Sequence, residues 1–363
     1  MKREVADTTT NGVAAEQATG FSCPLPLGNH ERILLAHGGG GKLTQELIQK
    51  VFLPQLKNDL LAQLHDGAMF SINGTRLAFT TDSYVVDPIF FPGGDIGMLA
   101  VNGTVNDLAM CGARPLYLSI AFILEEGFPM QDLRRVVASV HEAAKKAHVD
   151  LVTGDTKVVE RGKCDKMFIT TSGVGVIEQG IDINPKRAKP GDIVILSGRI
   201  ASHGIAVMSM REGLEFETEL QSDSTPLYGL VETMFQVTKN IHVLRDPTRG
   251  GVASALNEIA TSAHVGVVLD ETKIPISEEV EGACEILGFD PLYVANEGKL
   301  LAIVPPEDAD AILAATRNHP AGIDAEIIGE VVDMHPGLVT MKTRIGGSRV
   351  VDMLSGEQLP RIC

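Results

Sequence analysis

The sequence predicts a mixed α/β (α+β) protein with two domains, and three observations support this prediction. The chain has 363 residues, of which 44% are hydrophobic and 21% charged, so it is long enough for two domains and can bury a sizeable core. Segments with strand alternation and segments with helical spacing follow one another along most of it. A short basic connection between Pro185 and Pro190 interrupts this order, which restarts at Asp192. We therefore expect domains over residues 31–184 and 185–345.

The first predicted domain follows an N-terminal extension. Residues 1–30 hold no apolar periodicity, so we expect them to be disordered and assign them no function. A strand or loop over 32–36 leads into a glycine turn and then into a helix that Pro54 ends. The elements expected next are a strand ending near Asp82, a buried helix over 95–110, a core strand over 116–124, an amphipathic helix over 130–147, and strands over 149–152 and 166–177.

The second predicted domain repeats the mixture of strands and helices. Its strands are expected over 192–196, 265–269 and 300–304, with a final pair beyond them, and its helices over 204–210, 230–241, 252–263, 278–287 and 309–316. Each domain is expected to have its own core. From about Gly346 the sequence becomes rich in Gly, Ser, Asp and Glu, so residues 346–363 are expected to form a mobile tail.

The charge balance and the cysteines exclude several classes of partner. The chain carries 31 Lys and Arg against 47 Asp and Glu, a formal net charge of −16, so a nucleic-acid backbone would be repelled. No stretch approaches the ~20 apolar residues of a membrane helix, and residues 1–20 lack the apolar centre of a signal peptide. The five cysteines form no C-x-x-C pair, which favours reduced thiols. We expect a cytoplasmic protein without membrane or nucleic-acid partners.

A run of glycines followed by a lysine is the first candidate binding motif. Gly38, Gly39, Gly40 and Gly41 leave backbone N–H groups uncovered, and Lys42 adds a cation just before a helix begins. This combination favours anion binding. The spacing is not that of the ordinary P-loop, and a glycine run by itself is more often a plain flexible turn.

Four aspartates at predicted element ends are candidate ligands for Mg²⁺ beside a nucleotide phosphate. They are Asp82, Asp107, Asp155 and Asp246, each next to Thr or Asn or close to glycine. Hard carboxylate oxygens are the ligands that Mg²⁺ prefers. Each one alone is more simply explained as an Asx turn or a helix cap, but four together weaken that explanation.

The buried helix predicted over 95–110 carries a polar stripe. Asp95, Asn102 and Asn106 fall within roughly 40° of one another on the helical wheel. Buried polar groups need hydrogen-bond partners. Either another element of the fold or a bound ligand must therefore satisfy these three side chains.

Lys157 and Glu297 are candidates for proton transfer. Each follows a predicted strand near a glycine that permits close approach, although a surface ion pair explains each equally well. His37 and His203 have no partner histidine at metal-ligand spacing, so we expect both to be structural. These two histidines are therefore left out of the candidate site.

The sequence given ends in Cys363, whose thiol has no evident role in the fold. A thiolate is a strong nucleophile, but only a small fraction of a free thiol is ionised at pH 7 unless a cation such as Arg361 helps. The C-a-a-X prenylation pattern is not satisfied, because there the cysteine stands fourth from the end. A tail of this length could carry the thiol across a whole domain. A chance terminal cysteine is the alternative.

Eight sequence runs together resemble the HypE family of hydrogenase maturation factors, which act as carbamoyl dehydratases. They are HGGGGK, FTTDSYVVDPIFFPGGDIG, NDLAMCGARP, FILEEG, VTGDTKVVERG, LRDPTRGGV, ANEGKL and PRIC, and they extend over residues 37–363. Several are similar to the wider superfamily of aminoimidazole ribonucleotide synthetase and selenophosphate synthetase. A selenophosphate synthetase would carry a reactive Cys or selenocysteine in the glycine segment, and this chain has glycine there. A nucleotide-binding scaffold without catalysis is the non-enzyme alternative.

The resemblance implies a PurM-like fold whose N-terminal domain pairs with its copy in a homodimer, with ATP in clefts at the interface. It also implies that the carbamoyltransferase HypF loads a carbamoyl group onto Cys363. ATP would then drive dehydration to a thiocyanate, and the cyanide would pass to the HypC–HypD complex for the iron of a [NiFe] hydrogenase. The sequence leaves open whether Cys363 serves its own subunit or its partner.

Our sequence-based hypothesis assigns a role to each candidate residue. Metal binding is assigned to Asp82, Asp95, Asp107 and Asp246. Nucleotide binding is assigned to the Gly38–Gly41 amides, Lys42, Asn102, Asn106 and Asp155. Catalysis is assigned to Cys363, Glu297 and Lys157, where Glu297 and Lys157 remove the nitrogen protons and either of them is the base.

Overall fold

The computed structural model describes residues 30–213, 220–356 and 361–363. The chain separates into two units, residues 1–33 and 34–363, and the second unit contains every element discussed below. The extension predicted over residues 1–30 falls almost entirely outside the described residues, as does part of the predicted tail. Within the described ranges, no helix combines the length and the apolar character needed to cross a bilayer.

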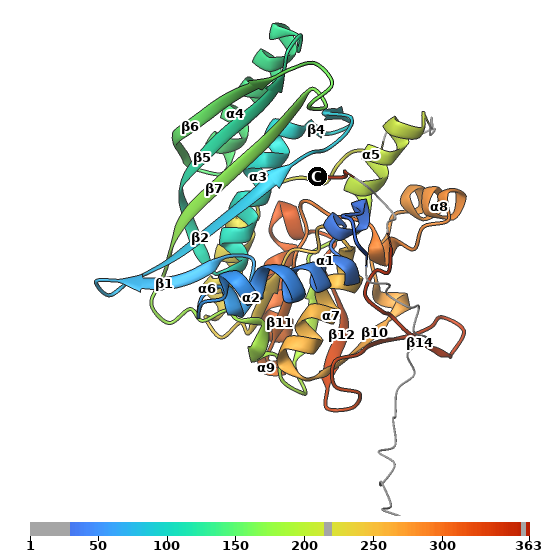
Figure 1. Cartoon of the computed structure of the whole chain (residues 1–363). Coiled ribbons are helices and arrows are strands. Elements are labelled where there is room, and N and C mark those ends of the chain that lie inside the picture. Colours follow the sequence, from blue (N-terminus) through green and yellow to red (C-terminus); the bar gives the residue numbers. More distant parts are fainter. Residues whose placement is uncertain (1–29, 214–219, 357–360) are drawn as a thin grey trace, which may run out of the picture. The chain divides into compact units, whose positions relative to one another are not determined.

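A five-stranded sheet forms the first half of the unit (Figure 1). Two helices, α3 (Ile96–Met110) and α4 (Met130–Lys146), pack against one of its faces. Strands β5 and β6 are parallel, and the other neighbours are antiparallel. In spatial order the strands are β1 (Ala68–Ile72), β2 (Thr75–Tyr84), β7 (Met167–Ile177), β5 (Ala113–Glu125) and β6 (Asp150–Val159).

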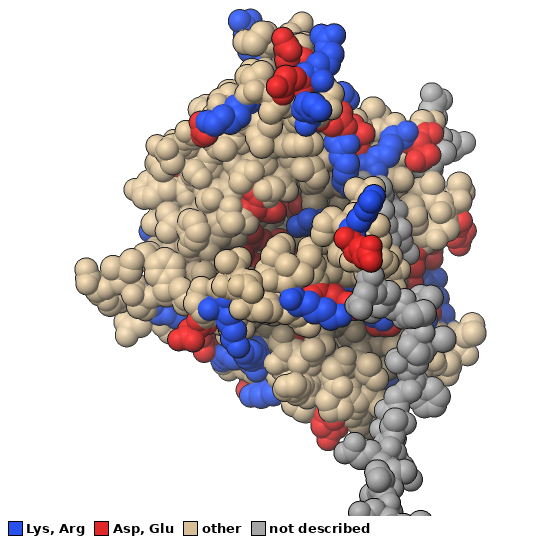
Figure 2. Space-filling model, in the orientation of Figure 1, with Lys and Arg blue, Asp and Glu red and all other residues tan. Residues whose placement is uncertain are grey.

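The opposite face of this sheet, here called the open face, is covered by no helix of the described residues. Because side chains alternate along a strand, Phe79, Tyr117 and Ile123 point to this side, and they are 46%, 47% and 37% exposed. Thr81 and Ser83 of β2 also lie there, each within hydrogen-bonding distance of a hydroxyl on β7. Figure 2 shows the part of the sheet over β2, β5 and β7 as a mostly uncharged surface.

A seven-stranded sheet forms the second half. Helices α6 (Tyr228–Val237) and α9 (Pro306–Arg317) cover one face, and α7 (Gly251–Ala263) covers the other. Two further helices are α5 (Ser202–Glu212) and α8 (Glu278–Leu287). In spatial order the strands are β14 (Ser348–Val350), β13 (Val339–Lys342), β10 (Gly266–Asp270), β12 (Glu326–Val332), β8 (Ile193–Leu196), β11 (Leu301–Val304) and β9 (Val243–Arg245). The predicted α/β class is confirmed.

The expectation of a separate core for each half is wrong. One cluster of buried side chains joins Leu108 and Met110 of α3 to Leu230 and Met234 of α6. The reason is the sequence of α3, which is apolar on nearly all sides, so that its last turn packs on its own sheet and on the second half at once. The two halves are therefore held against each other through α3.

The segment before the first sheet also differs from its prediction. After the short turn η1 (Leu35–Gly38), α1 (Lys42–Leu47) continues through the π-helical turn η2 (Ile48–Phe52) into α2 (Leu53–Leu56). Pro54 therefore does not end the helix. It occupies the first turn of α2, where the missing N–H of proline costs no hydrogen bond. The short elements that remain are η3 (Leu61–Gln63), β3 (Phe90–Phe91), β4 (Gly94–Asp95), η4 (Pro185–Arg187), η5 (Glu271–Lys273), η6 (Pro291–Tyr293) and η7 (Pro320–Gly322).

Two predicted boundaries are corrected as well. The strand predicted over 149–152 is β6, and it runs on to Val159, so Asp155 and Lys157 lie inside it rather than at its end. The tail predicted from residue 346 contains β14, and Val351 and Leu354 are buried after it. These apolar residues pack on the second sheet, which the polar composition around them concealed.

Candidate active site

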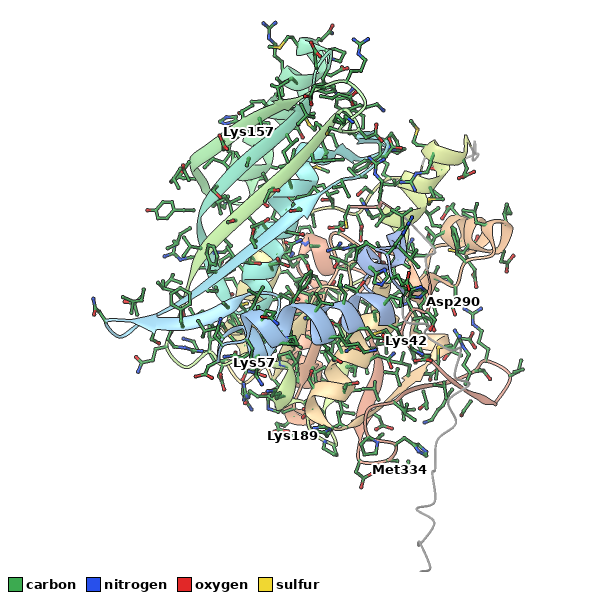
Figure 3. All side chains as sticks on the ribbon, in the orientation of Figure 1. Lys42, Lys57, Lys157, Lys189, Asp290 and Met334 are labelled. Carbon is green, nitrogen blue, oxygen red and sulfur yellow. The ribbon has the colours of Figure 1, made fainter. Side chains whose placement is uncertain are left out.

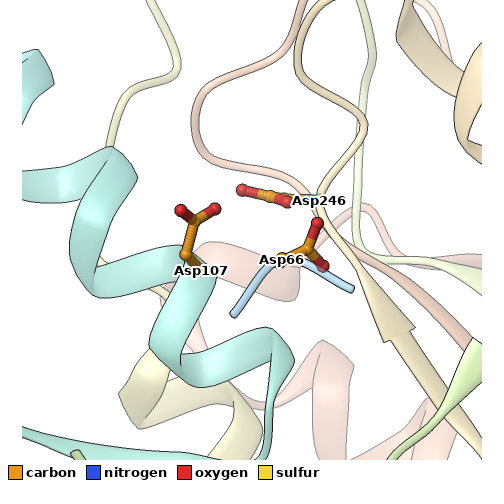
Figure 4. A group of neighbouring side chains, drawn as sticks. All are labelled: Asp66, Asp107 and Asp246. Carbon is orange, nitrogen blue, oxygen red and sulfur yellow. The ribbon is translucent and has the colours of Figure 1, made fainter. Parts of the chain in front are cut away.

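Three carboxylates meet where the two halves join. Asp66 precedes β1, Asp107 lies in the last turn of α3, and Asp246 follows β9 (Figure 4). One carboxylate oxygen of each lies within 4.8 Å of the others. Figure 2 shows acidic side chains in a hollow between the first sheet and the helices below it. Three carboxylates from three elements at this separation suit a divalent cation such as Mg²⁺.

The electrostatics of this acidic cluster favour a bound cation. Burial raises the pKa of Asp107 well above its usual range, and the charges of Asp246, Asp82 and Asp66 raise it further. Burial and the charge of Asp66 raise the pKa of Asp246 to about 8. A positive ion at this position would stabilise the ionised carboxylates and reverse both shifts.

Asp66 differs from the other two members because Arg245 neutralises it. Burial works to raise the pKa of Asp66, but the guanidinium of Arg245, 2.8 Å away, lowers it below its ordinary value. The same guanidinium pairs with Glu258 at 2.5 Å. Arg245 therefore fixes one wall of the cluster and leaves Asp107 and Asp246 as the under-neutralised pair.

Asp82 and Thr80 extend the site along β2. Thr80 donates a hydrogen bond of 2.8 Å from its hydroxyl to Asp107. Asp82 is two residues further on, so it points to the same side of the sheet, and it lies 4.0 Å from Arg249. The structure thus brings together three of the four predicted aspartates, namely Asp82, Asp107 and Asp246.

Glu297 occupies a buried position on the opposite side of the acidic cluster. Its backbone N–H donates to Asp223 at 3.1 Å, and its carbonyl accepts from Asn106 at 3.3 Å. Its carboxyl oxygen Oε1 is buried and has no hydrogen-bond partner among the described residues. Burial, together with the charges of Asp246 and Asp82, raises the pKa of Glu297 well above its usual range. Such a carboxyl can exchange a proton near neutral pH.

The docked end of the chain, Arg361–Cys363, lies beside these carboxylates. It pairs with the segment after β2, where the N–H of Val85 donates to the carbonyl of Cys363 at 3.0 Å and the N–H of Asp87 donates to that of Arg361 at 3.2 Å. Cys363 is only 7% exposed. Burial raises the pKa of its thiol to about 12, against the opposing charge of Arg249 and with the support of Glu297. The docked thiol is therefore protonated at neutral pH.

Side chains that sequence reasoning did not assign to the site hold this docked segment. His203 of α5 contacts the carbonyl of Ile362 at 2.9 Å, and Arg211 of the same helix donates to the carbonyl of Arg361 at 2.9 Å. The Arg361 side chain in turn pairs with Asp165 at 2.5 Å. Figure 1 shows the end of the chain next to α5. His203 is thus structural, as expected, and the structure it supports is the position of Cys363.

The glycine run lies against both the docked region and the acidic cluster. The backbone N–H of Lys42 donates to Leu354 at 2.9 Å, and its ammonium group pairs with Asp352 at 2.5 Å. Gly40 has a positive φ of 73°, and a Cβ there would lie 2.6 Å from the carbonyl of Arg249, so only glycine fits. A small cavity of about 120 Å³ joins Gly40 to Asp246 and Arg249.

Asp155 and Lys157 are not brought to this site within one chain. They form an ion pair of 2.6 Å with each other on β6, and both side chains are more than half exposed. They pair in register with Ala121 and Ile123 of β5, which places them on the open face. Figure 3 shows Lys157 on the first sheet, well separated from Lys42 beside α1.

The polar stripe of α3 is satisfied mainly by another element. Asp95 caps the helix by accepting from Gly97 and Met98 at 2.8 and 3.0 Å, and it stands apart from the acidic cluster. Asn106 accepts from the N–H of Leu227 at 2.8 Å, and Asn102 donates to Ser224 at 3.0 Å. The segment over 224–227 thus supplies the partners that the sequence demanded.

Asp66 is the member of the cluster that sequence analysis missed. It precedes Gly67 directly before a strand, which is the pattern used to select the other aspartates. The signal was therefore present, but the short strand β1 carries too few alternating residues to be recognised. Arg249, which faces both Asp82 and the thiol, was missed for another reason, since its role depends on contacts far along the chain.

The sequence matches two parts of a known enzyme class. Residues 64–177 match the family described as AIR synthase related protein, N-terminal domain, and residues 189–341 match its C-terminal domain. The fold is also similar to that of thiamine monophosphate kinase from Aquifex aeolicus, with a TM-score of 0.61 at 20% identity. The two halves and the carboxylates at their junction thus define an AIR synthase related protein.

Comparisons over nearly the whole chain narrow the class. The chain is 55% identical to the carbamoyl dehydratase HypE of Cupriavidus necator, covering 95% of this chain and 98% of the relative. A crystal structure of a HypE–HypF complex matches with a TM-score of 0.81 at 51% identity, covering 85% and 99%. A HypE structure in complex with ATP matches with a TM-score of 0.77 at 51% identity, covering 92% and 100%. The chain belongs to the HypE family of carbamoyl dehydratases.

Proposed function

We propose that this protein uses ATP to dehydrate a carbamoyl group carried on Cys363 to a thiocyanate, which supplies the cyanide ligands of a [NiFe] hydrogenase iron. The observation that carries the proposal is the position of the Cys363 thiol, buried beside Glu297 and Arg249 and next to the acidic cluster. A buried, protonated thiol is a poor nucleophile in this position. Cys363 therefore receives its cargo elsewhere and reacts here.

The nucleotide site of the proposal lies between the glycine run and the acidic cluster. The Gly38–Gly41 amides and Lys42 would face the phosphates, and Asp66, Asp107 and Asp246 would hold Mg²⁺ with Asp82 beside them. The structure of a related HypE with ATP supports this assignment. When bound, Mg²⁺–ATP supplies the γ-phosphoryl group that converts the carbamoyl oxygen into a leaving group.

The residues of the chain position the carbamoyl group and move its protons. His203 and Arg211 hold the backbone of the docked segment, so the cargo on sulfur reaches the carboxylates in a fixed orientation. Glu297 takes a proton from the carbamoyl nitrogen through its unpartnered oxygen as the carbon–oxygen bond breaks. Arg249 lies beside Asp82 and the thiol and offsets the negative charge that develops there.

Lys157 enters the proposal through a second copy of the chain. The open face is broad, largely uncharged and uncovered by any helix of the described residues, which suits a homodimer interface (Figure 2). Lys157 and Asp155 project from that face. We place them at the active site of the partner subunit, where Lys157 assists Glu297 in removing the nitrogen protons.

The proposed partners follow from the cargo. HypF would load the carbamoyl group, in agreement with the solved HypE–HypF complex, and the HypC–HypD complex would accept the cyanide. Both transfers require Cys363 to leave its buried position. The docked segment is connected to the rest of the chain through residues 357–360, which lie outside the described residues.

Mass spectrometry of the C-terminal peptide tests the proposal. Incubation with HypF, carbamoyl phosphate and ATP should add about 43 Da and then remove about 18 Da as the carbamoyl group becomes a thiocyanate. Cys363→Ala should fold normally but show neither change. A cyanide-delivering alanine variant would exclude Cys363 as the carrier, and a stable first adduct without later loss would favour a nucleotide-binding scaffold.

A further inference from the structure

A second large cavity lies on the other side of the Glu297 loop, away from the acidic cluster. Its volume is about 730 Å³, within the range of ordinary small-molecule sites. Residues of both halves line it, which is where ligand sites occur most often. It is bounded by the end of α4, the start of β5, the start of α6 and η7.

The charged groups of this cavity contrast with the rest of the molecule. Arg114, Lys146 and Lys299 line it against two carboxylates, Asp223 and Glu232, although the whole chain has a formal charge of −16. Lys299 is paired with Asp223 at 3.4 Å. In the described part of the chain no carboxylate lies within 4.0 Å of Arg114 or Lys146, and Lys146 donates to the hydroxyl of Thr225 at 3.0 Å.

Neutral hydrogen-bond donors converge on the same space. The backbone N–H of Ala321 donates to Nδ1 of His319 at 3.1 Å, so the ring proton of the neutral imidazole is on Nε2. Burial lowers the pKa of His319 and keeps the ring neutral. Nε2 faces Gly229, where a Cβ would lie 3.4 Å away. Gly229 belongs to the first turn of α6, which begins without a side-chain cap and presents backbone N–H groups.

We propose that this cavity binds a phosphate-bearing small molecule whose organic part fills the remaining volume. The phosphate group would accept from the first turn of α6 and from His319 Nε2, and its charge would be met by Lys146 and Arg114. A phosphate alone is far smaller than 730 Å³. The proposal goes beyond the dehydration reaction and does not depend on it.

Titration calorimetry on the full chain tests this site with two probes, inorganic phosphate and ribose 5-phosphate. Nucleotides are avoided because they would also enter the proposed ATP site. Ribose 5-phosphate should bind at one site, and more tightly than inorganic phosphate. Lys146→Glu should weaken its binding at least about tenfold, because a charged hydrogen bond is replaced by repulsion. The matched control Lys145→Glu changes the neighbouring exposed residue, which does not line the cavity, and should bind normally.

Several outcomes would overturn the proposal. These are no saturable binding of either probe, equal affinity for both probes, or equal weakening by Lys145→Glu and Lys146→Glu, which would indicate general surface electrostatics. Binding that is lost in Lys42→Ala but kept in Lys146→Glu would place the probe at the nucleotide site instead. Arg114→Gln provides a second cavity variant if Lys146→Glu alters the melting curve, and it should also weaken ribose 5-phosphate binding.

Discussion

Asp82 and Asp155 are alike in sequence and different in surroundings. Each is next to a threonine in a strand of the same sheet. Asp82 lies on the side of α3, close to Arg249 and the acidic cluster, whereas Asp155 lies on the open face and pairs with Lys157 at 2.6 Å. The difference teaches that one chain builds the docking and metal-binding part of the site, while its second proton-transfer group can act only on another copy.

Replacement of Glu297 by Gln should have the largest effect on this comparison. The amide keeps the shape of the buried side chain but cannot take the nitrogen proton, so thiocyanate formation should fall by at least about 10²-fold. The carbamoyl adduct on Cys363 should accumulate, as followed by single-turnover mass spectrometry. Glu142→Gln, an exposed substitution on α4, is the matched control. Unaltered turnover in Glu297→Gln would remove Glu297 from proton transfer.

Mixed dimers test whether Lys157 acts across the open face. Lys157→Ala and Glu297→Gln should each be inactive alone. When the two variants are mixed, half of the dimers contain one site with both residues intact, so about a quarter of the wild-type activity should return. Measured activity after co-refolding checks this. No recovery, with dimers present by sedimentation, would show that the two residues serve the same chain.

The stability of the metal-free protein should depend on pH through the acidic cluster. Burial and Asp66 raise the pKa of Asp246 to about 8, so between about pH 4 and pH 8 the folded chain keeps a proton that the unfolded chain releases. The free energy of unfolding should therefore fall as pH rises through this window. Asp246→Asn should flatten that fall in urea titrations without divalent metal. An identical slope in the variant would contradict the raised pKa.

Asp95→Ala should have the smallest effect. Asp95 caps α3 through two backbone N–H groups, so its loss should lower the free energy of unfolding by about 1 kcal/mol. Because Asp95 stands apart from the acidic cluster, Mg²⁺-dependent ATP binding should remain at the wild-type level. Thermal unfolding and a nucleotide titration give both values. A loss of Mg²⁺ dependence would instead restore Asp95 to the metal site, as the sequence alone had suggested.

The sequence predicted elements well where the pattern was local and poorly where it depended on distant contacts. The helix of α3 and its cap could be recognised because thirteen of its fifteen residues are buried and its polar stripe is regular. The face of Asp155 could not, because it depends on how β6 pairs with β5. The position of Cys363 depends on Val85, Arg211 and His203, which lie far from it in sequence.

Asp223 stands between the two ligand sites discussed above. One of its oxygens accepts the N–H of Glu297, and the other faces Lys299 in the large cavity. A ligand that draws Lys299 away would change the charge balance of the carboxylate that holds the Glu297 backbone. Coupling of this kind is reciprocal, so any factor by which the cavity ligand alters nucleotide affinity must equal the factor by which nucleotide alters affinity for that ligand. The supply of cyanide would thereby become sensitive to a metabolite that takes no part in making it.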